Sequence, residues 1–329
     1  MTTIDTLPKS FLVRRPAMDD LEAVYDVMVA CGIEEDGSVD FPQDEIRTVW
    51  EMPGFNLATD AWVVLSPEGR IVGYADIEDT AHARIFSFVR VHPEYRGRGI
   101  STYLLGQVEQ RAREHIPLAR PEVRVTLSVQ CSHANAAAGP LLARAGFTRE
   151  RHHWGMEITM DEPPRAPQWP EGITVRTFAL GQDERTTFNG TEDAFRDHWG
   201  YMPWNYEQWE HSTIKREDFD PTLWFLAFAG NELAGCSLCE YNMTMGWVHQ
   251  LAVRRPWRRK GLAMALLLHS FAEFYRRGTR AVGLGVDAQS LTGATRLYER
   301  AGMHIARQYD TYLKELRAGE ELATQALGE

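Results

Sequence analysis

Residues 250–263 read Gln-Leu-Ala-Val-Arg-Arg-Pro-Trp-Arg-Arg-Lys-Gly-Leu-Ala, and residues 88–101 read Phe-Val-Arg-Val-His-Pro-Glu-Tyr-Arg-Gly-Arg-Gly-Ile-Ser. The two stretches lie 162 residues apart, and each leads from an apolar strand pattern through a proline and a basic, glycine-containing turn into an amphipathic helix pattern. Glycine lets the backbone approach an anion closely, and a helix start offers unpaired N–H groups with a partial positive charge. Each turn is therefore suited to holding phosphate groups.

These turns carry a family resemblance. The motif Arg258, Gly261 and Ala263, with its near match Arg96, Gly99 and Ser101, resembles the pyrophosphate-binding motif of the GCN5-related N-acetyltransferases (GNAT). Both halves share it: Val-Arg pairs at 13–14 and 175–176 open them, and Ala-Gly-Phe at 145–147 or Ala-Gly-Met at 301–303 closes them. A looser likeness to the mycothiol synthases, a tandem branch of this family, rests on residues 219–221 and 286–294.

The repeat and the length predict the domain organisation. A chain of 329 residues exceeds the size at which one hydrophobic core usually keeps growing. We expect an N-terminal GNAT domain at 1–162 without catalysis, a linker at 163–170, a catalytic GNAT domain at 171–316, and a flexible tail at 317–329. Four prolines within residues 161–170 exclude a helix or a central strand there, so the linker should be stiff and extended.

Composition restricts the class of protein. The net charge of −11 argues against broad adhesion to nucleic acid or to an anionic membrane. It suits a cationic acceptor, but also simple solubility. No run reaches the ~20 apolar residues of a membrane span, and four cysteines in a long chain without a leader-like start favour the reducing cytoplasm. Cys236 and Cys239 have Cys-x-x-Cys spacing within an apolar run, which indicates strand cysteines and no zinc site.

Periodicity and turn residues predict the same order of elements in each half. We expect strands at 11–15, 61–65, 70–76, 84–91, 123–129 and 147–160, and helices at 19–31, 99–114 and 135–145. In the second half we expect strands at 173–178, 223–229, 233–241, 247–253 and 281–287, and helices at 183–209 (broken near Gly200 and Pro203), 262–277 and 292–300. This order predicts the α/β (α+β) class, with two domains that each hold a mixed, mostly antiparallel sheet and helices on both faces.

The resemblance implies acetyl-CoA as cosubstrate and no metal. Backbone N–H groups of the loops would bind its pyrophosphate, and the strand before each loop would pair with its pantetheine arm. The implied cofactor-binding residues are Leu251, Ala252, Val253, Arg258, Arg259, Lys260, Gly261, Leu262 and Ala263, and in the first half Val89, Val91, Arg96, Gly97, Arg98, Gly99, Ile100 and Ser101.

The two halves differ where the resemblance implies a general acid. Family members often protonate the departing thiolate with a tyrosine four residues before the closing glycine, and Tyr298 stands there in the second half. Leu142 stands there in the first half and has no proton to give. His249 is the implied general base, because an unperturbed imidazole titrates near neutral pH, and Glu240 is the alternative base. Tyr298 and His249 also have packing interpretations.

The acceptor is predicted to be a small-molecule primary amine. Glu192, Asp193, Trp199 and Tyr201 combine carboxylates with aromatic faces, which suits an organic cation but equally a packed interface. Two other functions remain open: a non-catalytic, regulatory CoA-binding protein, and an aminoacyl-tRNA-dependent transferase of the same fold. The protein is expected to be a monomer or homodimer without nucleic-acid or membrane partners.

Overall fold

The structure is a computed structural model and describes residues 7–39, 42–243 and 245–325. The chain forms two compact units. The N-terminal unit comprises the residues up to His152 together with Gln308–Leu322, and the C-terminal unit comprises His153–Arg307 together with the residues from Ala323. These units differ from the predicted domains because strands β6 (Thr148–Thr159) and β12 (His304–Arg317) each begin in one unit and end in the other.

The N-terminal unit holds a mixed sheet in the order β1-β2-β3-β4-β5-β12. Among the described residues, its strands pair antiparallel except β4 with β5, which are parallel. The elements are β1 (Leu12–Arg14), α1 (Leu21–Asp36), α2 (Gln43–Trp50), α3 (Leu57–Asp60), β2 (Ala61–Leu65), β3 (Ile71–Thr80), β4 (Arg84–Val91), α4 (Ile100–His115), β5 (Val125–Ser132) and α5 (Ala138–Arg144).

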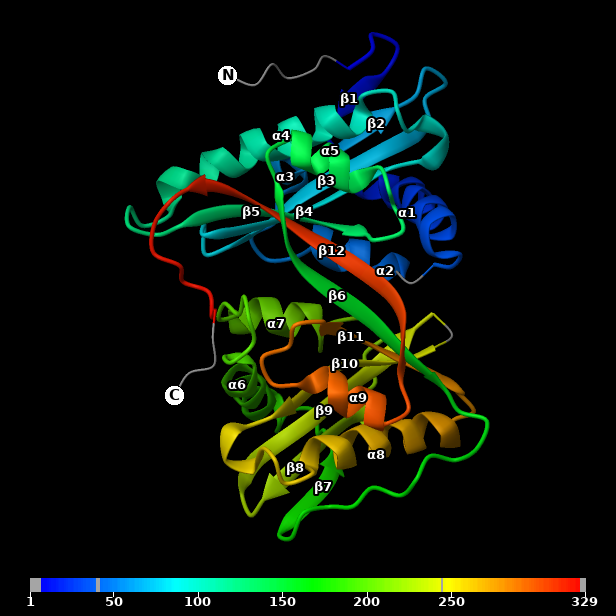
Figure 1. The fold of residues 1–329 in the computed structure, drawn as a ribbon, viewed down its shortest axis with the longest axis vertical. Helices are drawn as coiled ribbons and strands as arrows, with labels where there is room; N and C mark the ends of the chain where they lie inside the picture. Colours follow the sequence, from blue (N-terminus) through cyan, green and yellow to red (C-terminus); the bar gives the residue numbers. More distant parts are fainter. Residues whose placement is uncertain (1–6, 40–41, 244, 326–329) are drawn as a thin grey trace. The chain divides into compact units, whose positions relative to one another are not determined.

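The C-terminal unit repeats this plan in the order β6-β11-β10-β9-β8-β7, and again one pair, β10 with β11, is parallel. Figure 1 shows α8 and α9 on one side of this sheet. The elements are β7 (Ile173–Thr177), α6 (Glu184–Phe195), α7 (Tyr206–Ser212), β8 (Trp224–Ala229), β9 (Glu232–Asn242), β10 (Met245–Val253), α8 (Leu262–Arg276), β11 (Ala281–Asp287) and α9 (Ala294–Arg300).

Alternating strand residues give each sheet two apolar faces. On β8, Phe225 and Ala227 pack in one core with helix α8, whereas Trp224 and Leu226 pack in a second core that includes Ala194 of α6. Side chains alternate across a strand, so a sheet covered on both faces needs an uninterrupted apolar run. The predicted fold class is confirmed.

The local predictions are confirmed in part. The segment 183–209 forms two helices, α6 and α7, broken as predicted near Gly200, which takes a left-handed backbone conformation (φ 76°) between them. Helices α2 and α3 were not predicted. The tail is attached as far as the described residues reach: Arg124 binds Glu321 at 2.8 Å, and the hydroxyl of Thr324 donates to the backbone oxygen of Arg196 at 2.8 Å.

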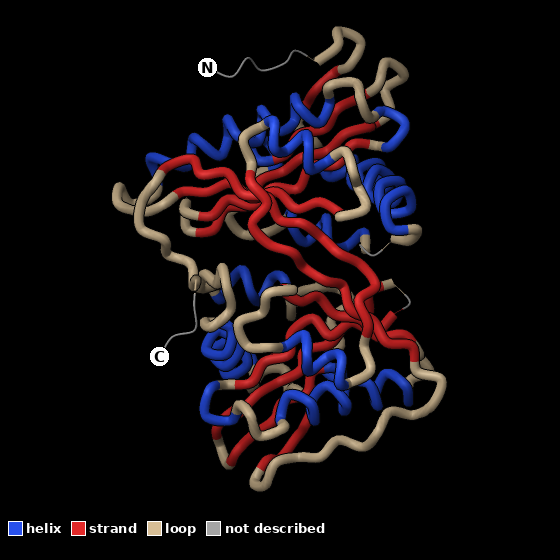
Figure 2. The backbone as a smooth tube through the Cα atoms, in the orientation of Figure 1, coloured by secondary structure: helices blue, strands red, loops and turns tan. Residues whose placement is uncertain are grey.

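The linker lacks regular secondary structure, and the cysteines of the Cys-x-x-Cys spacing lie on a strand. Residues 163–170 contain neither helix nor strand (Figure 2), and Arg165 donates to the backbone oxygen of Arg300 at 3.1 Å. Cys236 and Cys239 are buried free thiols on β9, and burial raises their pKa values to about 12 and about 11. None of the helices in the described part of the chain is both long and apolar enough to cross a membrane.

Candidate active site

The parallel strands β10 and β11 separate almost at once. Their ladder has two pairs among the described residues, Gly246 with Val282 and Trp247 with Gly283. The antiparallel pairing of β10 with β9 shifts between Val248 and Gln250, so His249 lies at a bulge. Beyond the bulge, the edge of β10 that faces away from β9 has no ladder to β11. A bound chain could hydrogen-bond to this open edge.

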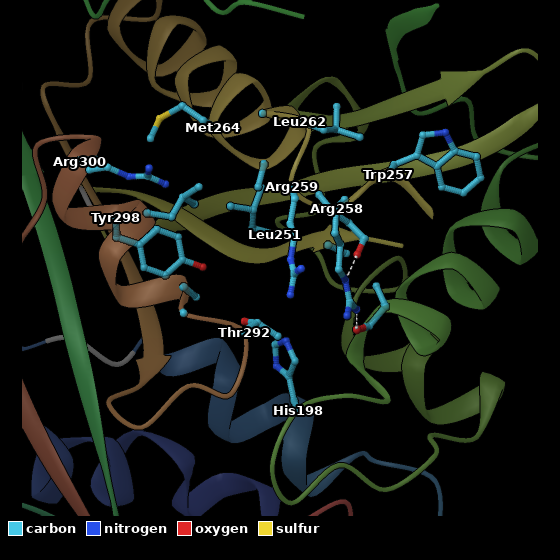
Figure 3. A pocket seen from close by; sticks show the side chains of 18 of the residues that line it. His198, Leu251, Trp257, Arg258, Arg259, Leu262, Met264, Thr292, Tyr298 and Arg300 are labelled. Carbon is cyan, nitrogen blue, oxygen red and sulfur yellow. Dashed lines mark hydrogen bonds between the residues drawn. The ribbon is translucent and has the colours of Figure 1, made fainter. Parts of the chain in front are cut away.

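A cavity of about 840 Å³ lies beside the open edge, and the predicted cofactor residues supply much of its wall (Figure 3). Leu251, Ala252 and Val253 line it from β10. Arg258, Arg259, Gly261, Leu262 and Ala263 line it from the loop and the start of α8, whereas Lys260 does not. The volume is in the range of small-molecule sites.

Gly261 shapes the loop at the start of α8. It is the N-cap with φ 87°, a conformation that favours glycine. A Cβ atom built there would meet no protein atom within 4 Å, so the space beside the helix start is open. Open space in front of unpaired N–H groups is what a bound pyrophosphate requires.

The two loop arginines have different surroundings. The Arg258 guanidinium donates to the backbone oxygens of Val253 and Ala194, both at 2.9 Å, and pairs with Asp197 at 2.5 Å. Its N–H groups therefore hold the loop in place, and its predicted contact with the cofactor stays a prediction. Arg259 has no ion-pair partner among the described residues, and its side chain extends into the cavity (Figure 3). Its φ of 60° is unusual for a residue with a Cβ.

Tyr298 lies on α9 with its hydroxyl directed into the cavity (Figure 3). The residue is 8% exposed, and its hydroxyl forms no hydrogen bond with any described residue. Burial raises its pKa to about 12. A phenol with so high a pKa keeps its proton at neutral pH and has that proton free to donate.

His249 and Glu240 form a second cluster that does not line the cavity. The Nδ1 atom of His249 lies 3.3 Å from Oε1 of Glu240, and Arg216 lies 3.9 Å from the same carboxylate. Burial alone would raise the pKa of Glu240, but the charge of His249, its hydrogen bond and Arg216 together hold that pKa below its ordinary value. The predicted base and its alternative are thus partners, with Glu240 ionised.

The four predicted acceptor residues lie outside the cavity wall and are engaged with neighbours. The Tyr201 hydroxyl donates to Glu192 at 2.6 Å, and Trp199 Nε1 donates to Gln325 at 2.9 Å. Asp193 pairs with Arg254 at 2.7 Å and with Arg196 at 2.9 Å. These bonds support the packing interpretation of Asp193 more than a free anionic site, so the acceptor role of the four stays a prediction.

The N-terminal loop has the same build. Gly97 and Gly99 adopt φ 76° and 82°, and Arg96 pairs with Glu35 at 2.5 Å, as Arg258 does with Asp197. β4 and β5 also separate, after Ser87 and Val129. The remaining predicted residues hold the corresponding places: Val89 and Val91 end β4, Arg98 lies within the turn, and Ile100 and Ser101 begin α4.

Sequence reasoning assigned no site role to several polar residues of the cavity wall, among them His198 and Arg165. His198, which follows α6, lines the cavity, and burial together with the charge of Arg258 lowers its pKa. Arg165 lines it from the linker. No short-range pattern marks either residue, because both reach the cavity from segments distant from the loop in sequence.

Comparisons with known proteins agree with this geometry. The sequence model of the acetyltransferase (GNAT) family matches residues 21–147 and 191–303. A mycothiol acetyltransferase of Thermobispora bispora is 33% identical over 224 residues, covering 64% of this chain and 70% of the relative. One from Streptomyces scabiei is 30% identical over 312 residues, covering 92% and 96%.

Solved structures show the same architecture. A GCN5-related N-acetyltransferase from Sphaerobacter thermophilus is 37% identical, with a TM-score of 0.82 over 97% of this chain and 100% of that one. A tandem GNAT protein from the clavulanic acid biosynthesis pathway shares the fold at 18% identity, with a TM-score of 0.68 over 94% and 100%. The family uses acyl-CoA, and the mycothiol acetyltransferases among the relatives of this chain indicate a small-molecule substrate. The chain belongs to the acetyltransferase (GNAT) family and is an N-acetyltransferase.

Proposed function

We propose that the chain transfers the acetyl group of acetyl-CoA to the primary amine of a small molecule, and that this chemistry takes place in the C-terminal unit. One observation carries the proposal. A protonated tyrosine hydroxyl, that of Tyr298, points into a cavity bounded by an open strand edge and a glycine loop at a helix start.

The cavity wall fits acetyl-CoA. Backbone N–H groups at Gly261 and Ala263 would receive the pyrophosphate, and the small Ala263 side chain keeps clear of it. Arg259 adds a positive charge directed into the same space. The edge of β10 at Leu251 to Val253 would pair with the pantetheine amides and deliver the thioester to the point where the strands separate.

The proposed chemistry is a direct transfer. An ammonium has no lone pair, so the acceptor first loses a proton to His249, which Glu240 orients and stabilises in its charged form. The amine nitrogen then attacks the thioester carbonyl, and the carbon–sulfur bond breaks. The Tyr298 hydroxyl protonates the leaving thiolate, and the attacking nitrogen gives up its surplus proton, which returns Tyr298 to the neutral phenol, so that amide and free thiol are the products.

For the acceptor, we propose the amine precursor of mycothiol, on the basis of the names of the relatives. The two alternative functions predict different results with acetyl-CoA. A regulatory CoA-binding protein would bind acetyl-CoA without turnover. An aminoacyl-tRNA-dependent transferase would ignore acetyl-CoA.

The test is a panel of amines incubated with acetyl-CoA, with products identified by mass. The mycothiol precursor, polyamines, aminoglycosides and amino acids form the panel, and the mass readout is needed because an acceptor with its own thiol would disturb a thiol assay. We expect an acetyl adduct on the precursor, with Gly261→Glu as the inactive control. Binding of acetyl-CoA without any adduct across the panel would refute the enzymatic proposal, and an adduct on another amine alone would refute the acceptor.

A further inference from the structure

Three side chains of the N-terminal unit direct their polar atoms at one another. Asp79 is the residue before the last in β3, His82 lies in the β3–β4 turn, and His115 ends α4. The Nδ1 atoms of the two histidines are 3.4 Å apart, and His115 Nδ1 lies 3.1 Å from Oδ2 of Asp79. His82 Nδ1 contacts the same oxygen. One atom of each residue therefore faces a common point.

Hydrogen bonds alone account poorly for this triangle. If both imidazoles donate from Nδ1 to the shared oxygen, their two N–H groups crowd each other, and if one does not, two lone pairs face each other. A cation at the centre removes the conflict, because all three atoms are ligands. Two nitrogens on a tetrahedral Zn²⁺ with bonds of about 2.0–2.1 Å lie about 3.3 Å apart, close to the 3.4 Å observed between the imidazoles, whereas the closer contact of His82 Nδ1 with Oδ2 of Asp79 has to open to admit the ion.

The backbone holds the three residues in this arrangement. Ala81 and His82 adopt φ 54° and 55°, so two residues with a Cβ form a tight turn that usually prefers glycine or asparagine. The His82 N–H donates to Oδ1 of Asp79 at 2.8 Å, which leaves Oδ2 for the imidazoles. His115 is buried, whereas the side chain of His82 is 41% exposed, so an ion can enter from the turn.

We propose that Asp79, His82 and His115 bind one divalent transition-metal ion of the Zn²⁺ class, with water completing its coordination. Imidazole nitrogens with one carboxylate select such ions over Mg²⁺ and Ca²⁺, which prefer oxygen ligands. The ion joins the β3–β4 turn to the end of α4. β4 leads to the N-terminal loop and α4 begins there, so the site lies at the opposite ends of these elements and its role is structural.

The test uses the untagged, full-length protein after removal of metal with a chelator. Co²⁺, a coloured substitute for Zn²⁺, is titrated first, and Zn²⁺ is then used to displace it. We expect one equivalent to bind with the visible absorption of four- or five-coordinate Co²⁺. Saturating Zn²⁺ should raise the unfolding temperature by several degrees, since it binds only the folded state.

Two variants and a matched control separate the site from the fold. Asp79→Asn keeps the side-chain shape, and His82→Asn suits a positive φ, so both should fold as the wild type does by circular dichroism and lose at least about tenfold in affinity. His133→Ala removes an imidazole from a second cluster, where His133 and His152 bind opposite oxygens of Asp310 at 2.9 and 2.6 Å. It should bind the ion normally. Absence of binding to the wild type, or equal binding by both asparagine variants, would overturn the proposal.

Discussion

Replacing Tyr298 by phenylalanine tests the proposed acid most directly. The change keeps the ring and removes one hydroxyl. The residue is 8% exposed, and its hydroxyl points into the cavity and has no hydrogen-bond partner among the described residues. Loss of an unbonded hydroxyl should leave the free energy of unfolding within about 1 kcal/mol of the wild type. If the hydroxyl protonates the thiolate, the chemical step should slow by roughly 10² to 10⁴, which corresponds to about 3–5 kcal/mol in the activation free energy.

The assay is single-turnover acetylation at saturating acceptor, together with calorimetric binding of acetyl-CoA and thermal unfolding. Because the pKa of Tyr298 is raised to about 12, its proton is present through neutral and mildly alkaline pH. The wild-type rate should therefore show no alkaline decline from this group below about pH 10. An unchanged rate in the variant would refute the proposed role, and an equal loss of stability and rate would assign Tyr298 to packing.

Further predictions concern the two glycine loops, the proposed base and the ion pair between Asp197 and the loop arginines. Gly261→Glu should abolish turnover by placing a charged side chain in the open space at the start of α8, whereas the matched Gly99→Glu should leave the chemical step mostly intact. Single-turnover kinetics on both variants checks this. A larger loss of rate from Gly99→Glu would place catalysis in the N-terminal unit. Arg259→Gly should relieve a strained φ and raise the unfolding temperature slightly while weakening acetyl-CoA binding in calorimetry; tighter binding would contradict the proposed phosphate contact. His249→Asn should slow the reaction most at pH values below the pKa of the acceptor amine, where the amine is protonated and needs a base. Glu240→Gln should have a similar but smaller effect, since Glu240 is proposed to act through His249. A larger loss of rate from Glu240→Gln than from His249→Asn across the pH profile would make Glu240 the base. Asp197→Asn should lower the free energy of unfolding by about 2 kcal/mol at neutral pH, because hydrogen bonds from Arg255 and Arg258 lower the Asp197 pKa to about 2. This contribution is present above about pH 4 and is lost as the pH falls towards 2. Urea unfolding should therefore show the stabilities of the wild type and the variant converging in acid.

The fold was largely predictable because the signals that define it are local. Proline, glycine and the basic residues mark both loops, and β-branched runs separated by turn residues mark the hairpins. The exchange of strands was not predictable in the same way. Strands β6 and β12 occupy equivalent places in the two halves, and sequence pattern alone does not decide which sheet each will join. Pairing over such sequence separation depends on tertiary packing.

The site was predictable where a sequence motif specifies the backbone conformation. It was less predictable where a side chain forms an ion pair with a residue distant in sequence. Gly261, Ala263 and Tyr298 all reach the cavity as predicted. The ion pair of Arg258 with Asp197 was not predicted, and the cofactor contact of Arg258 stays a prediction. A signal for this existed: Glu35 and Asp197 lie 162 residues apart, as do Arg96 and Arg258. A repeated acid matched to a repeated arginine indicates a structural pair in both halves.

The residue after the arginine that both loops share differs between the two halves. Gly97 adopts φ 76° freely, whereas Arg259 adopts φ 60° at a cost of roughly 1 kcal/mol relative to glycine. A strained residue whose charged side chain extends into a cavity is better explained by ligand binding than by stability. The same half has Tyr298 where the other has Leu142. Two positions on different elements, a loop and a helix, thus independently support the proposal that acetyl-CoA binds and reacts in the C-terminal unit.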